Sequence, residues 1–167
     1  MFAGPRHRRE LSKHSLYRGM LLSVTALAAC LGFIQTAAGD QSADFKQDLA
    51  QGYSELASFA EIRTHDAAGQ SYFQNKSDRA RALYKVDPEW PTNWSVAPDL
   101  QKTMMRDRQA LVAALTNPKA GHDPKAEAMA QVNFDCWVAL SSVASLAPES
   151  ERCRNAFQAA LQQIGPP

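Results

Sequence analysis

The chain of 167 residues is poor in the residues that mark unusual protein classes. Eight glycines and nine prolines, spread without a period, exclude a collagen-like chain or a low-complexity linker. Three cysteines are too few for a small disulfide-dense scaffold. A net charge of +1 indicates no preference for a strongly charged partner. With 45% hydrophobic and 21% charged residues, the composition is that of one ordinary globular domain with a short additional segment.

The chain also lacks the short motifs of common enzymes. It contains no GxSxG, HExxH, GxGxxG or Walker pattern, and no CxxC or CxxCH. His65 and Asp66 are adjacent, but Asp66 is better explained as a helix cap than as an acid–base partner. His65 and His122 stand in separate expected turns, which argues against a zinc site. We therefore predict a non-enzymatic protein without a cofactor or a metal.

The first forty residues have the layout of a secretory signal. Five basic residues and one acidic residue precede an apolar run at 20–34, and small residues follow at 36–39. A helix over that run spans about 22 Å, less than the ~30 Å hydrocarbon core, which favours a cleaved signal over a permanent span. Without residues 1–30 the chain has 13 basic and 16 acidic residues, a net charge of −3. This balance argues further against a nucleic-acid surface.

Two cleavage sites compete at the end of this leader. The Leu-Ala-Ala-Cys sequence that ends at Cys30 resembles the lipobox of bacterial lipoproteins, which implies that Cys30 carries a lipid and becomes the mature N-terminus. Residues 1–29 are then the signal peptide, 30–42 a tether and 43–165 a helical domain. The alternative is ordinary cleavage after Ala38, favoured by the apolar residues that continue past the cysteine, and it would release the mature protein.

Apolar residues recur at every third or fourth position after the leader and predict helices. We expect five, at residues 41 to about 63, 66–84, 98–117, 123–143, and from the turn at 147–149 to residue 164. Asp66 and Asp123 are suited to N-caps, and Pro98 and Pro124 to first helical turns. We find no alternating strand pattern of useful length. The prediction is an all-α domain of about five helices in antiparallel hairpins.

Two tryptophans lie in the segment that separates the second and third expected helices. Pro88, Pro91 and Pro98 exclude regular helix there, and Trp90 and Trp94 stand among them. Tryptophans in a loop usually fold back onto the core because of their large apolar area. The alternative is that Trp90 and Trp94 form a surface that contacts a partner.

Two cysteines lie on the apolar stripes of the last two expected helices. Cys136 precedes the turn near Leu146 by about ten residues and Cys153 follows it by about seven, so both stand ~10–15 Å from the bend. In an antiparallel hairpin they can face each other, and a disulfide between them would stabilise the fold by ~3 kcal/mol. Two buried free thiols are the alternative.

Two segments resemble a known family. They are DLAQGYSELA at 48–57 and AQVNFDCW at 130–137, the second being followed by CRNAF at 153–157. Both are similar to the helical N-terminal region of OmpA-family lipoproteins from alphaproteobacteria, over roughly residues 43–164. The resemblance implies an envelope protein with a lipid anchor at Cys30 and a structural pair of Cys136 and Cys153. Full family members continue into a peptidoglycan-binding α/β domain that this sequence does not contain, so no residue here inherits that role.

These features predict a cell-envelope lipoprotein module, either an anchored spacer or a protein-interaction domain at the outer membrane, facing the periplasm. The expected partners are the membrane, through a lipid on Cys30, and other envelope proteins contacted through Trp90 and Trp94. We expect no nucleic-acid binding and no direct peptidoglycan binding. The alternative is a soluble periplasmic binding or chaperone-like helical protein.

Overall fold

The computed structural model describes residues 38–117 and 123–164, with side chains from residue 43 onward. The predicted signal peptide and the predicted lipid-attachment residue Cys30 lie outside these ranges. The described residues contain five α-helices and no strand, so the predicted all-α fold is confirmed. None of the described helices has both the length and the apolar character needed to cross a membrane.

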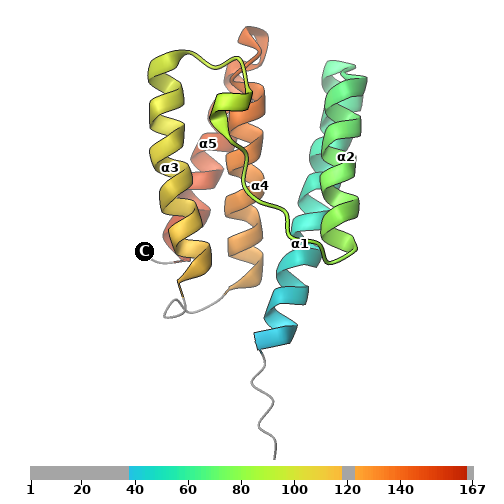
Figure 1. Ribbon diagram of the computed structural model, residues 1–167. Coiled ribbons are helices and arrows are strands. Elements are labelled where there is room, and N and C mark those ends of the chain that lie inside the picture. Colours follow the sequence, from blue (N-terminus) through green and yellow to red (C-terminus); the bar gives the residue numbers. More distant parts are fainter. Residues whose placement is uncertain (1–37, 118–122, 165–167) are drawn as a thin grey trace, which may run out of the picture. The chain divides into compact units, whose positions relative to one another are not determined.

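The first and fourth helices run in one direction and the other three in the opposite direction (Figure 1). The five helices are α1 (Ala38–Phe59), α2 (Ala67–Arg81), α3 (Pro98–Thr116), α4 (Pro124–Leu140) and α5 (Ala147–Gln163). Helices α1 and α2 pack as one antiparallel hairpin and α4 and α5 as another. Helix α4 also contacts α1 and α3, and therefore links both hairpins. The segment between α2 and α3, residues 82–97, is called the crossover loop below.

Several helix boundaries follow the sequence signals. The side chain of Asp66 accepts from the backbone N–H of Ala68, and the side chain of Asp123 caps α4 in the same way. Pro98 and Pro124 are the first residues of their helices. The two aspartates accept from backbone N–H groups that the start of a helix leaves without a partner. The two prolines lack a backbone N–H, and none is needed at the first helical position.

Several boundaries differ from the prediction. The first helix begins at Ala38, inside the predicted tether at 30–42, and α2 and α4 end at Arg81 and Leu140, three residues before the predicted ends at 84 and 143. The first helix does not stay α-helical to residue 63, because Ala60–Thr64 widen into a π-helical turn that ends at His65 with a φ of 52°. The last helix starts at Ala147 with Pro148 in its first turn, so residues 147–149 do not turn the chain. The bend comes earlier, through a 3₁₀ turn at Ala144–Leu146, since a proline is well tolerated at the start of a helix.

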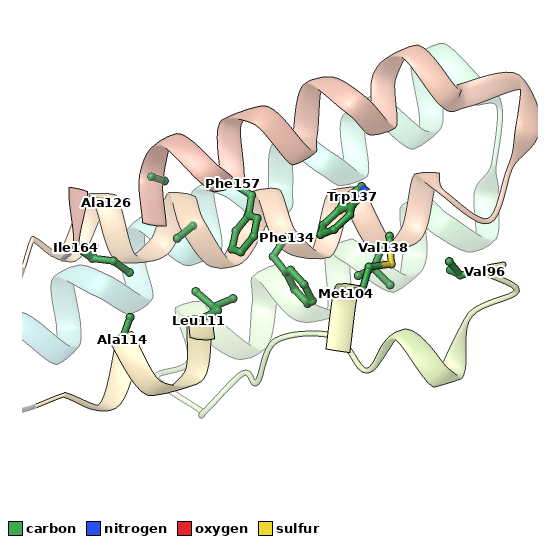
Figure 2. Close-up of a cluster of buried hydrophobic side chains, with 12 residues drawn as sticks. Val96, Met104, Leu111, Ala114, Ala126, Phe134, Trp137, Val138, Phe157 and Ile164 are labelled. Atoms are coloured by element: carbon green, nitrogen blue, oxygen red, sulfur yellow. The ribbon is translucent and has the colours of Figure 1, made fainter. Parts of the chain in front are cut away.

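Helix α4 is buried on nearly all sides because apolar clusters form on two of its faces. One cluster joins α4 to α3 and α5 and contains Phe134, Trp137 and Phe157. Their ring centres lie 5.3–6.2 Å apart, and Figure 2 shows these rings beside Met104. The other cluster joins α4 to α1 and α2. A helix that is apolar around most of its circumference is expected at the centre of a domain.

Candidate functional site: a buried charged cluster, a disulfide and an apolar cavity

Three charged side chains meet inside the domain and are called the Lys76 cluster: Lys76 of α2, Glu89 of the crossover loop and Asp135 of α4. The Nζ atom of Lys76 donates to Glu89 Oε1 and, at 2.6 Å, to Asp135 Oδ2. Its third donor faces the backbone oxygen of Asp87 at 3.4 Å. The three side chains are 9%, 6% and 0% exposed. One buried cation therefore pairs with two buried carboxylates, so the three ionised groups together carry a formal charge of −1.

Neutral groups complete the hydrogen bonding of Asp135. The hydroxyl of Tyr53 on α1 donates to Asp135 Oδ2 at 2.5 Å, and the backbone N–H of Glu89 donates to Oδ1 at 2.8 Å. Gln131, one helical turn before Asp135, donates to the Tyr53 oxygen and to the backbone oxygen of Val86. Gln131 and Asp135 thus bind the crossover loop and α1 to the same face of α4.

Glu89 and Arg108 hold the rest of the crossover loop. Glu89 Oε1 accepts from the hydroxyl of Tyr72 at 2.7 Å, and Oε2 accepts from Trp94 Nε1 at 3.0 Å. Arg108 of α3 donates from Nε to the backbone oxygen of Glu89 at 2.9 Å. Its guanidinium carbon lies 3.5 Å from the centre of the Trp90 ring. The loop is therefore fixed by buried polar contacts to α2, α3 and α4, which satisfy its backbone away from water.

The charges of the cluster shift one another's pKa values. Burial by itself would raise the pKa of Glu89, but the Lys76 ammonium and several donors hold it below its usual value. Burial likewise opposes the charge of Lys76, yet the two carboxylates raise its pKa above the ordinary value. Asp135 is fully enclosed, and burial raises its pKa despite the attraction of Lys76. Burial and then the Asp135 charge raise the pKa of Tyr53 well above 10, so its phenol stays neutral.

The geometry of the cluster favours a structural role over a catalytic one. Each N–H donor of Lys76 has a protein acceptor, and all four carboxylate oxygens of Glu89 and Asp135 accept from protein donors. A general base or nucleophile needs a lone pair directed at its substrate. Within the described ranges, no group of three His, Cys, Asp or Glu side chains is placed to hold a metal ion.

The two predicted disulfide residues lie together. The sulfur atoms of Cys136 on α4 and Cys153 on α5 are 1.97 Å apart, at bonding distance, with their Cα atoms separated by 5.8 Å. Cys136 is buried and Cys153 packs against the cluster of α3, α4 and α5. The pair therefore links the two helices of one hairpin across their shared apolar face, as the sequence spacing predicts.

The two predicted partner-contact residues have different surroundings. Trp94 is partly buried and packs against both apolar clusters, and its indole N–H is bound to Glu89. Trp90 is 48% exposed, with Arg108 covering one face of its ring. Trp94 thus folds back onto the core, as expected for a tryptophan in a loop, whereas Trp90 exposes part of its ring to solvent.

An apolar cavity of about 250 Å³ lies between the end of the first hairpin and the bend of the second. Its walls include Leu56 and Phe59 of α1, Phe73 of α2, and Leu140 of α4. Val143, in the bend, is 44% exposed and also lines it. The sequence pattern did not indicate this cavity, because it depends on how closely two hairpins approach each other.

The Lys76 cluster was also missed by sequence reasoning, although part of it left a signal. Gln131 and Asp135 are polar residues four positions apart in a helix that is otherwise apolar, a spacing that puts both on one buried face. Such a pair indicates a polar partner inside the domain. Lys76 lies among other polar residues and Glu89 lies in a proline-rich loop, so neither carries a comparable signal. Both become buried only through tertiary packing.

Comparisons with known proteins do not assign the chain to a family: no family model matches it, and neither a curated protein nor a solved structure matches significantly. The resemblance to OmpA-family lipoproteins therefore stays a prediction.

Proposed function

We propose that this chain is a non-enzymatic module of the bacterial cell envelope, anchored by a lipid on Cys30 and serving as a spacer or protein-interaction domain at the outer membrane. The leader and its Leu-Ala-Ala-Cys sequence support export and lipidation. The network of satisfied charges in the Lys76 cluster supports a scaffold, since its ionisable groups bind one another rather than an open site.

The observation that carries the proposal is the close pair of Cys136 and Cys153. Disulfides form and persist in oxidising compartments such as the periplasm and are rare in the cytosol. The pair lies in the apolar interface of α4 and α5, where a bond between the sulfurs would strengthen the hairpin without requiring a new backbone arrangement. An exported protein is the natural setting for such a link.

A protein-interaction role is supported by the exposed ring of Trp90, one face of which lies against the buried Arg108. Tryptophan and arginine are the residue types most enriched among energetically dominant interface contacts. Here the Trp90 ring is half exposed while Arg108 is held by the backbone oxygens of Pro88 and Glu89. A fixed aromatic side chain loses little conformational entropy when a partner covers it.

The two segments that carry the proposed family resemblance contact each other inside the domain. Tyr53 of the first segment bonds to Asp135 of the second. Gly52 lies so close to α4 that an added Cβ would stand 2.7 Å from Cγ2 of Val132. The shared sequence features therefore correspond to the packing of α1 on α4.

Metabolic labelling with radioactive palmitate tests the anchor. In a Gram-negative host, the full chain should incorporate label and fractionate with the outer membrane, and Cys30→Ser should abolish both. The double variant Cys136→Ser/Cys153→Ser is the matched control and should keep the label. Absence of Cys30-dependent label, with a mature N-terminus at Gly39 by intact mass spectrometry, would instead support the released periplasmic protein.

Site-specific photo-crosslinking in intact cells tests the interaction role. A photoreactive phenylalanine analogue replacing Trp90 should form a discrete crosslinked envelope species. The same analogue replacing Tyr84, which is 65% exposed, should not. Equal crosslinking at both positions, or none at either, would argue against a partner surface at Trp90 and leave the spacer role as the proposal.

A further inference from the structure

We propose that the cavity between the two hairpins is a binding site for a neutral aliphatic chain, such as the hydrocarbon part of a small lipid or alcohol. This inference is independent of the lipid anchor proposed above. The space of about 250 Å³ has mainly apolar walls and is open to solvent beside Val143, so an apolar ligand can reach it. Apolar cavities of about 150 Å³ already bind a molecule as large as benzene.

The cavity exists because small residues stand where larger ones would close it. Ala60 lies in the π-helical turn, Gly69 in α2 and Ala139 in α4, and all three line the space. The π-helical turn displaces the end of the first helix from an ordinary α-helical path. Such turns are frequent at functional sites.

The lining decides the chemistry of the occupant. Thr64, Ser142 and Asp66 also line the cavity; Thr64 and Ser142 have partners within the protein, whereas Asp66 is exposed and lies on the solvent side. Thr64 donates to the backbone oxygen of Ala60 at 2.7 Å, Ser142 donates to that of Ala139 at 2.6 Å, and Asp66 accepts from the backbone N–H of Ala68. The remaining walls are mainly aliphatic and aromatic. A ligand with a charged or strongly polar group inside the cavity would lose its hydration without compensation, which favours a neutral hydrocarbon.

The bend between α4 and α5 offers a way in. Val143 lines the cavity and is 44% exposed, so its side chain lies at the boundary with solvent. The aromatic side chains of Phe73 and Trp94 line the same space. The chain would enter beside Val143 and lie against these rings, leaving any polar end group in water.

Displacement of a fluorescent probe tests this site. The full chain carrying Cys30→Ser is used, so that neither an attached lipid nor detergent competes. The neutral dye N-phenyl-1-naphthylamine should bind saturably, and straight-chain 1-alkanols should displace it. Their affinity should rise about fourfold per added methylene until the hydrocarbon fills the cavity, and then level off.

A matched pair of variants locates the binding. Val143→Trp places a large ring at the mouth of the cavity and should weaken binding of the dye by about tenfold or more. Met129→Trp makes the same kind of change at a residue of α4 that is 47% exposed and does not line the cavity, and should leave binding within about twofold. Circular dichroism confirms that both variants fold. Absence of saturable binding, equal loss in both variants, or no levelling with chain length would each overturn the proposal.

Discussion

Replacing Lys76 with methionine should destabilise the domain far more than removal of an ordinary surface lysine. Methionine keeps much of the length and apolar volume of the side chain, so the change mainly removes the charge. Glu89 and Asp135 would then face each other with side chains 6% and 0% exposed and without their shared cation. Breaking a buried ion pair by removing one partner costs about 3–5 kcal/mol. This is a large part of the ~5–15 kcal/mol that stabilises a typical domain.

The assay is urea unfolding followed by far-UV circular dichroism, with Lys102→Met as the control. Lys102 pairs with Asp99 on the surface, where both side chains are at least 78% exposed, and its loss should change the unfolding midpoint little. A Lys76→Met variant within about 1 kcal/mol of the parent would refute the reasoning. It would mean that water or rearrangement supports the two carboxylates without the lysine.

A double-mutant cycle separates the charge effect from a general packing defect. Asp135→Asn added to Lys76→Met removes one of the two unpaired charges while preserving most of the shape. The double variant should therefore be more stable than the sum of the two single losses predicts, with a coupling energy of about 0.5–3 kcal/mol. Strict additivity would show that Lys76 and Asp135 do not act as a pair.

Three further changes probe the rest of the domain. Cys136→Ser/Cys153→Ser should lower the free energy of unfolding by about 3 kcal/mol in denaturant titrations, and alkylation of the native parent should leave both thiols unmodified. Gly52→Ala should cost about 1–3 kcal/mol, because the added Cβ would stand 2.7 Å from Cγ2 of Val132, and added Val132→Ala should recover part of the loss. The pKa of Lys76 is raised in the folded state from 10.5, so the folded state keeps this proton to higher pH than the unfolded chain does. That stabilisation is complete below about pH 10.5 and is lost as pH rises through the folded pKa, so a smaller alkaline loss is expected in Lys76→Met.

The helices of this domain are encoded locally, and their caps show why. Asp66 and Asp123 satisfy backbone donors within two or three residues of themselves, and Pro98 starts a helix by its own ring geometry. Such signals need no knowledge of the rest of the molecule. The antiparallel arrangement of α4 and α5 follows from the short connection between them, and this arrangement puts Cys136 opposite Cys153.

The π-helical turn and the cavity beside it could not be read from periodicity. A π turn changes the helical path by one residue, and its apolar spacing is close to that of an α-helix. The cavity is lined by Ala60 and Ala139, which are far apart in the chain and come together only through the packing of the two hairpins. Small residues are ordinary in helices, so nothing local marks these two.

The sequence by itself determined that the described domain is helical, where its helices are capped, and that Cys136 and Cys153 lie opposite each other on neighbouring helices. Each of these features depends on residues within a few helical turns of one another. Only the tertiary structure decided which polar residues are buried. Lys76, Glu89 and Asp135 come from a helix, a loop and another helix, and no local pattern brings them together. Their pairing follows from the packing of α2 and the crossover loop on α4. Charges enclosed by that packing need partners, because a carboxylate removed from water is stable only beside a cation or hydrogen-bond donors.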